Sequence, residues 1–263
     1  MYELEHIRKR KKRRLAIIIG GVGTIGVTTF CIVAFLGRYV GSFTVSLEAK
    51  NVDLTLSEDS SFTNRSSFLR VNEVPPFQEF TYKEFSKFGD DVIDSEKSDI
   101  YLGANPDKDS LNFLKYTFFL KNVGFAPAKY DLSLQIKENV AASDGRTLED
   151  TLRVMVYEDG VSSVYAKPLQ APHKDEQGNL DYRAPISVDE DKATADYPFE
   201  GYANSFVSSS EVMNQKAVEL NVGEYKRYTV VTWLEGFRSS NTQTAPKGAT
   251  IKLGVEINAY ENE

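Results

Sequence analysis

Hydrophobic and polar residues alternate with a period of two along several stretches of the chain after residue 42. The alternation is clearest over residues 43–47, 130–137 and 251–257, where every second side chain is apolar. This period is typical of a strand that shows one face to a core and the other to water. Residues 228–234 are apolar on both faces and residues 113–121 are similar, which indicates central strands of a sheet.

Turn-forming residues separate these strands. Asn122-Val-Gly124 follows the strand of residues 113–121, and Asp159-Gly160 separates LRVMVYE from VSSVYAK as a hairpin signal. The pattern gives about nine strands, which suits a two-layer sandwich. The sequence therefore predicts a mainly β fold over residues 43–263. We expect a single antiparallel β-sandwich, Ig-like or jelly-roll-like, with one or two short helices.

The first short helix is predicted just after Pro75-Pro76. These prolines and Gly89 bracket the sequence FQEFTYKEFSKF as start and stop signals. Four aromatic side chains fall on one face of this helix: Phe77, Phe80, Phe85 and Phe88. We expect this face to plug an edge or end of the sandwich; the alternative is an aromatic surface for a sugar or a partner chain. A second short helix is predicted to open at Ser208–Glu211.

An uncharged apolar run extends from Leu15 to Gly37. As a helix it would be roughly 34 Å long, enough to cross a hydrocarbon core of about 30 Å. The sequence therefore predicts a transmembrane helix that serves as a single-pass signal anchor. The expected anchor positions are Leu15, Ile19, Gly20, Thr24, Thr28 and Leu36, of which Gly20, Thr24 and Thr28 form a small-residue stripe that can pack against another helix.

Basic residues precede this run and set the expected topology. They are Arg8, Lys9, Arg10, Lys11, Lys12, Arg13 and Arg14. Cations on this side predict a cytoplasmic tail over residues 1–14, a helix over 15–37, a linker over 38–42 and an extracellular domain over 43–263 at the cell membrane. The whole chain carries a net charge of −7 despite this basic tail. The acidic remainder argues against a nucleic acid partner.

Two other interpretations of the amino-terminal run stay open. Gly21, Gly23 and Gly26 match the dinucleotide-binding pattern, but no amphipathic helix and second strand follow them. The second interpretation is a cleaved signal peptide, for which Val40-Gly41-Ser42 would be a tolerable cleavage site before Phe43. The apolar core exceeds the usual length of a signal peptide, which favours the retained anchor. Cleavage would free a strand from Phe43 onward that adds to a neighbour's sheet and gives filaments.

Catalytic and metal-binding residues are scarce. One cysteine and two histidines exclude a disulfide framework, a four-cysteine zinc site and most acid–base chemistry. His173 lies in a polar stretch that is expected to be a solvated hairpin loop. No cofactor is predicted, although loop-bound calcium stays open. The acidic clusters considered for it are Asp90, Asp91 and Asp94, Asp107 and Asp109, and Asp189, Glu190 and Asp191.

Trp233 is the single tryptophan of the chain. Its place in the strand YTVVTWL predicts packing in or at the edge of the core, with stacking on a sugar as the alternative. Glu235 follows at the strand end, where its carboxylate is expected to cap a loop amide.

Several segments resemble one group of proteins. The unit YTFFLKNVGFAPAKYDLSLQI, the segments LRVMVYEDG and YKRYTVVTWLEGF, and the closing strand GATIKLGVEINAY are similar to exported β-sandwich proteins of Gram-positive bacteria, of the camelysin/TasA type. The resemblance implies a cell-envelope or matrix protein with a jelly-roll-like domain. It carries over no active-site residue.

These features favour a membrane-anchored cell-surface protein with a structural, assembly or binding role and without catalysis. The expected partners are the membrane, a second copy or another envelope protein, and a glycan. Alternatives are a carbohydrate- or peptidoglycan-binding module and a released filament-forming matrix subunit. An extracytoplasmic hydrolase built on paired carboxylates is a more remote alternative.

Overall fold

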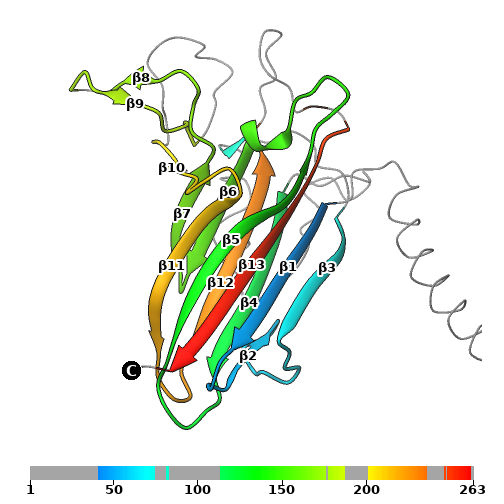
Figure 1. Ribbon diagram of the computed structural model, residues 1–263, viewed down its shortest axis with the longest axis vertical. Coiled ribbons are helices and arrows are strands. Elements are labelled where there is room, and N and C mark those ends of the chain that lie inside the picture. The colour runs from blue at the N-terminus through cyan, green and yellow to red at the C-terminus, as the bar shows by residue number, and fades with distance from the viewer. Residues whose placement is uncertain are drawn as a thin grey trace, which may run out of the picture. The chain divides into compact units, whose positions relative to one another are not determined.

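The computed structural model describes residues 41–74, 81–82, 113–175, 177–186, 201–235, 246 and 248–261. Two large sheets dominate these residues (Figure 1). Their strands are β1 (Gly41–Ala49), β2 (Leu54–Ser57), β3 (Phe68–Val74), β4 (Phe113–Asn122), β5 (Ala128–Val140), β6 (Leu152–Glu158), β7 (Val161–Ala166), β10 (Asn204–Ser205), β11 (Glu211–Leu220), β12 (Tyr225–Leu234) and β13 (Thr250–Glu261). A small hairpin of β8 (His173–Lys174) and β9 (Leu180–Asp181) and one 3-10 turn, η2 (Leu148–Asp150), complete the described elements.

Strand order defines two sheets, which are named here sheet A and sheet B. Sheet A has the order β11-β5-β13-β1-β3, and sheet B has the order β10-β7-β6-β12-β4-β2. The strands predicted from period-two alternation all lie in these sheets: residues 43–47 in β1, 130–137 in β5 and 251–257 in β13 form neighbours in sheet A.

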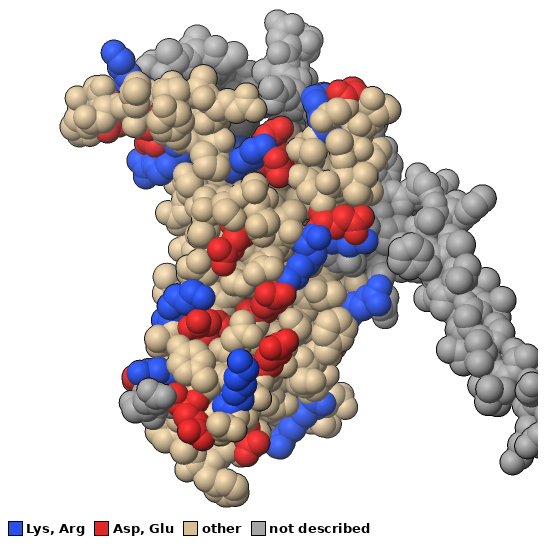
Figure 2. Space-filling view, in the orientation of Figure 1, with Lys and Arg blue, Asp and Glu red and all other residues tan. Residues whose placement is uncertain are grey.

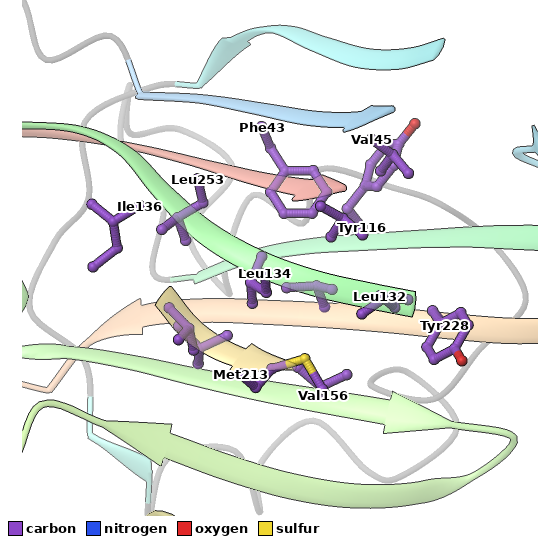
Figure 3. Close-up of a cluster of buried hydrophobic side chains, with 14 of the residues drawn as sticks. Phe43, Val45, Tyr116, Leu132, Leu134, Ile136, Val156, Met213, Tyr228 and Leu253 are labelled. Atoms are coloured by element: carbon purple, nitrogen blue, oxygen red, sulfur yellow. The ribbon is translucent and has the colours of Figure 1, made fainter. Parts of the chain in front are cut away.

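The main core lies between the two sheets, where the apolar faces of the alternating strands meet (Figure 3). Phe43 of β1 packs against Tyr116 of β4, with ring centroids 5.2 Å apart. The hydroxyl oxygens of Tyr130 on β5 and Tyr228 on β12 are 2.6 Å apart across the same space. Each large apolar side chain buried here contributes roughly 1.5–3 kcal/mol to folding. Packing between two sheets makes the fold a β-sandwich.

The outer face of sheet A is solvated and carries charges of both signs. Lys137 pairs with Glu256, Lys252 with Glu138, and Lys216 with Asp131. Figure 2 shows acidic and basic side chains interleaved over this face. Exposed pairs of this kind contribute little to stability, so the polar half of each alternating strand mainly keeps sheet A in water.

The outer face of sheet B is buried instead. A second apolar cluster covers it, with Phe113, Met155 and Trp233 at its centre. Arg153 lies on the same face, and its Nε donates to the carbonyl oxygen of Pro185 at 3.1 Å. Burial lowers the pKa of Arg153 to about 10, while the charge of Glu235 opposes that shift. Both faces of β4 and of most of β12 are therefore buried, which explains the apolar runs in these two strands.

The prediction of a purely antiparallel sandwich was wrong. β1 pairs with β13 in parallel, with Phe43 opposite Leu253, and β10 pairs with β7 in parallel. Both large sheets are therefore mixed. Period-two alternation shows which face of a strand is buried but does not give the direction of its neighbour, so the sequence pattern left strand direction undetermined.

The prediction of a transmembrane helix, and with it a single-pass signal anchor, is corrected. In the part of the chain that the structure describes, no helix is long and apolar enough to cross a membrane. Residues 15–37, on which the prediction falls, and the basic residues Arg8–Arg14 lie outside the described residues. The prediction rested on the length and the apolar character of the run alone.

Of the two predicted short helices, the one that falls on described residues was wrong. Ser208–Glu211 does not open a helix: the Ser208 backbone N donates to the Glu211 carbonyl in a turn, and β11 begins at Glu211. The described residues contain no α-helix. The helix predicted over residues 76–88 lies outside them except for Thr81 and Tyr82.

Candidate functional site

A pocket of about 350 Å³ lies between β7 of sheet B and β11 of sheet A, and we call it the edge pocket. Figure 1 shows these two strands beside each other at one side of the sandwich. β11 is the edge strand of sheet A, and the pocket beside it is open to solvent. Its walls combine apolar and polar side chains, among them Val156, Glu158, Tyr165, Met213, Gln215 and Lys226.

The register of sheet B places a carboxylate at the edge of the core. β6 presents Leu152, Val154 and Val156 to the space between the sheets, and Glu158 follows at the next position of the same face. Glu158 lies opposite Tyr228 on one side and Val161 on the other. The apolar side of β6 therefore ends in a charged group that faces the edge pocket.

A chain of hydrogen bonds with a defined direction leads to this carboxylate. Tyr228 Oη donates to Gln215 Oε1 at 3.2 Å, and Gln215 Nε2 donates to Glu158 Oε2 at 2.7 Å. A phenol has one proton to donate. Tyr130 must therefore be the donor in its 2.6 Å contact with Tyr228. The bonds fix the orientation of the Gln215 amide and leave its second N–H for another acceptor.

Lys226 supplies the positive charge of the edge pocket. Its Nζ lies 2.9 Å from Asp159 Oδ2 and 3.4 Å from Glu158 Oε1. The hydrogen bond to Asp159 and the charges of both carboxylates raise the pKa of Lys226, and partial burial opposes this. Lys226 is therefore an ammonium group at neutral pH.

Asp159 is held by the turn that the sequence predicted. Asp159 and Gly160 both have positive φ, 48° and 92°, in the hairpin between β6 and β7. Asp159 Oδ1 accepts the backbone N–H of Arg227 at 3.0 Å, and Asp159 N donates to the Arg227 carbonyl at 3.1 Å. The turn thereby fixes the second carboxylate next to Glu158.

This arrangement is suited to binding by hydrogen bonds. It combines a carboxylate, an oriented amide and an ammonium group over an apolar floor, as small-molecule sites do. Burial raises the pKa values of Tyr130 and Tyr228, and also that of Tyr165. These phenols are therefore protonated at neutral pH and act as neutral hydrogen-bonding groups.

The aromatic residues proposed from the sequence as a ligand surface, Phe77, Phe80, Phe85 and Phe88, lie outside the described residues. The three acidic clusters considered for calcium also lie outside them. Among the described residues, no group of three or more His, Cys, Asp or Glu side chains is arranged to hold a metal ion.

Trp233 and Glu235 occupy the places that the sequence predicted. Trp233 is fully buried, which agrees with packing rather than with a sugar platform. Its Nε1 donates to Glu235 Oε2 at 2.6 Å, and the backbone N of Tyr82 donates to the same oxygen at 3.0 Å. The prediction that Glu235 caps a loop amide is confirmed.

His173 lies on the small β8–β9 hairpin. Its ring stacks on Tyr202 with centroids 4.3 Å apart, and its Nε2 is 3.6 Å from Asp181 Oδ2. Hydrogen bonds from Arg183 lower the pKa of Asp181 to about 2. These contacts hold the hairpin together, and Gly178 turns it with a φ of 83°.

Sequence reasoning missed the residues of the edge pocket. Glu158 carried a signal, because it stands where the alternation of β6 calls for an apolar residue. Gln215 carried none, since register shifts in β11 between Glu211 and Met213 and between Gln215 and Val218 break the alternation.

No family model matches this chain, and no curated protein matches it either. One solved structure, described as "AvmM Catalyzes Macrocyclization in Alchivemycin A Biosynthesis", is similar at 10% sequence identity with a TM-score of 0.20. The match covers 57% of this chain and 81% of that chain. A likeness this low carries no argument about fold or function, so the inferences below rest on the edge pocket itself.

Proposed function

We propose that this chain is a non-catalytic binding protein that holds a carbohydrate in the edge pocket. The observation that carries the proposal is the convergence of Glu158, Gln215 and Lys226 on one space of about 350 Å³. This volume lies within the range of about 300–1,000 Å³ that small-molecule sites occupy.

The side chains match the chemistry of a sugar. Adjacent hydroxyls need acceptors and donors side by side, which the Glu158 carboxylate and the Gln215 amide offer. The less polar face of a sugar ring needs an apolar wall, which Tyr165 and Met213 offer. The hydrogen bond from Tyr228 orients the amide in advance, so less side-chain freedom is lost when a ligand binds.

Replacing Gln215 by alanine is expected to weaken sugar binding about tenfold or more. The change removes one donor and one acceptor, and tenfold corresponds to about 1.4 kcal/mol. The measurement is isothermal titration calorimetry of the full chain with a panel of neutral and amino mono- and disaccharides. Circular dichroism checks that the variant is folded.

The matched control is Gln135→Ala on β5. Gln135 bonds to Ser133 and Lys137 on the solvated face of sheet A, away from the edge pocket. Its removal is expected to leave sugar binding unchanged. Equal binding by the wild type and Gln215→Ala, or no heat with any sugar, would contradict the proposal.

Assembly through β1 is a second candidate function, in line with the resemblance to matrix proteins. The observation in its favour is that no hairpin connects β1 to β13, its parallel neighbour in sheet A. A second copy can therefore supply the same strand in the same register, as in domain swapping. The alternative cleavage site before Phe43 lies within β1.

A chain that begins at Phe43 is expected to form oligomers by exchanging this strand. The side chains that β1 buries, such as Val45 and Leu47, are covered equally well by another copy, so the exchange loses no apolar burial and a high protein concentration drives it. Analytical ultracentrifugation at high concentration, at neutral and acidic pH, measures the outcome. A monomer under all these conditions would rule out this route.

A further inference from the structure

We infer that the edge pocket selects a sugar that carries a free, protonated amine over the neutral and N-acetylated forms of the same sugar. The inference rests on the proposed function and names its ligand class. Its basis is the charge of the edge pocket: among the described residues that line it, two carboxylates, Glu158 and Asp159, face one ammonium group, that of Lys226.

The position of Lys226 shows where an ammonium group is accepted. Its Nζ lies between the two carboxylates, at 2.9 Å from Asp159 and 3.4 Å from Glu158. One positive charge does not balance two negative ones. The edge pocket therefore has an excess negative charge to offer to a ligand.

Glu158 has room for a further donor. An ionised carboxylate has about four acceptor positions. Gln215 Nε2 and Lys226 Nζ are the donors that contact Glu158 in the described residues. Side chains of Glu158 and Lys226 are 29% and 23% exposed, so both are reached from solvent. A ligand ammonium group can join Lys226 at Glu158 without displacing the Gln215 amide.

The carboxylate pair favours an ammonium group over a hydroxyl because the ammonium adds a Coulomb attraction between full opposite charges, which a neutral hydroxyl lacks. N-acetylation removes the charge and adds bulk at the same atom. The remaining hydroxyls of the ring meet the second N–H of Gln215 and the hydroxyl of Ser163, both at the walls of the edge pocket. Specificity for the amine therefore arises at Glu158 and Asp159.

The test compares glucosamine, N-acetylglucosamine and glucose by calorimetry on the full chain at pH 6. We expect glucosamine to bind at least about tenfold more tightly than the other two. Glu158→Gln, which keeps the shape and removes the charge, is expected to bring glucosamine to the level of glucose measured on the same variant. Glu256→Gln on the solvated face of sheet A is the matched control and is expected to change neither.

A second variant gives an effect of the opposite sign. Lys226→Met removes the cation that competes for the carboxylates and keeps the length of the side chain, so glucosamine is expected to bind severalfold more tightly. A merely structural role of Lys226 would weaken binding of every sugar. This variant also keeps the inference testable if Glu158→Gln does not fold.

The outcomes separate the inference from the proposed function. Equal binding of glucosamine and glucose, or weaker binding of glucosamine to Lys226→Met, would overturn the selection of an amine and leave the carbohydrate pocket standing. Absence of binding by all three sugars and by the disaccharide panel would overturn both.

Discussion

Replacing Trp233 by alanine is expected to lower the free energy of unfolding by about 4 kcal/mol, in the range typical of buried aromatic residues. The ring is fully buried on the outer face of sheet B, between Phe113 and Arg153 of the neighbouring strands. The change also takes the indole N–H from Glu235, a carboxylate that is only 3% exposed. The variant therefore loses stability in two ways: a cavity replaces the ring, and the buried Glu235 carboxylate loses one hydrogen-bond donor.

Urea unfolding followed by far-UV circular dichroism measures this loss, because the variant has no tryptophan fluorescence to follow. The control is Phe125→Ala, since Phe125 is fully exposed in the turn between β4 and β5. Its replacement is expected to change the free energy of unfolding by less than about 0.5 kcal/mol. Equal unfolding midpoints for the Trp233 variant and the wild type would show that the second cluster does not stabilise the fold.

Asn122→Ala is expected to cost about 3 kcal/mol of the free energy of unfolding, although the side chain is small. Asn122 is 1% exposed at the end of β4. Its Nδ2 donates to the carbonyl oxygens of Ala126 and Leu220, at 2.9 and 3.0 Å, and its Oδ1 accepts the N–H of Gly124 at 2.9 Å. Each buried group left without its partner costs about 1–3 kcal/mol.

Asn221→Ala is the matched control for this prediction, in the neighbouring turn between β11 and β12. The Asn221 side chain is exposed and bonds to Glu224 alone among the described contacts. Its loss is expected to cost less than about 1 kcal/mol. Chemical denaturation of both variants beside the wild type measures the difference, and equal costs would refute the role given to Asn122.

The contacts of Asn122 also explain the role of the Asn-x-Gly motif that follows the strand of residues 113–121. The sequence predicts a turn between two strands at Asn122-Val-Gly124, and this prediction is confirmed. The sequence did not indicate that this side chain ties the β4–β5 turn to the end of β11, at Leu220. Contacts between segments far apart in sequence leave no local pattern.

Strand positions were predictable wherever one face of the strand meets the core and the other meets water. β5 and β13 follow this rule over their central residues and were found. β11 was missed because its register shifts and the positive φ of Ala217, 52°, break the alternation. Its first residues, after Ser208, resembled a helix cap, since serine serves both turns and caps.

The edge pocket could not be predicted from the sequence, for a related reason. Glu158, Gln215 and Lys226 come from three strands, β6, β11 and β12, that do not all belong to one sheet. Glu158 alone interrupts an apolar face. The position of β6 and β12 relative to β11 decides that the three side chains meet, and that position depends on the packing of both sheets.

The place of β13 in sheet A has a consequence for how the chain folds. β13 lies between β5 and β1, so it joins the pair β11-β5 to the pair β1-β3. It is the last of the described strands, and the bond from Ser46 Oγ to the Val255 carbonyl spans 209 residues. Two-stranded ladders are marginally stable in water. During synthesis the two halves of sheet A thus stay separate until β13 has been made, and folding dominated by such distant contacts is slow. Loss of this one strand would divide sheet A rather than shorten it.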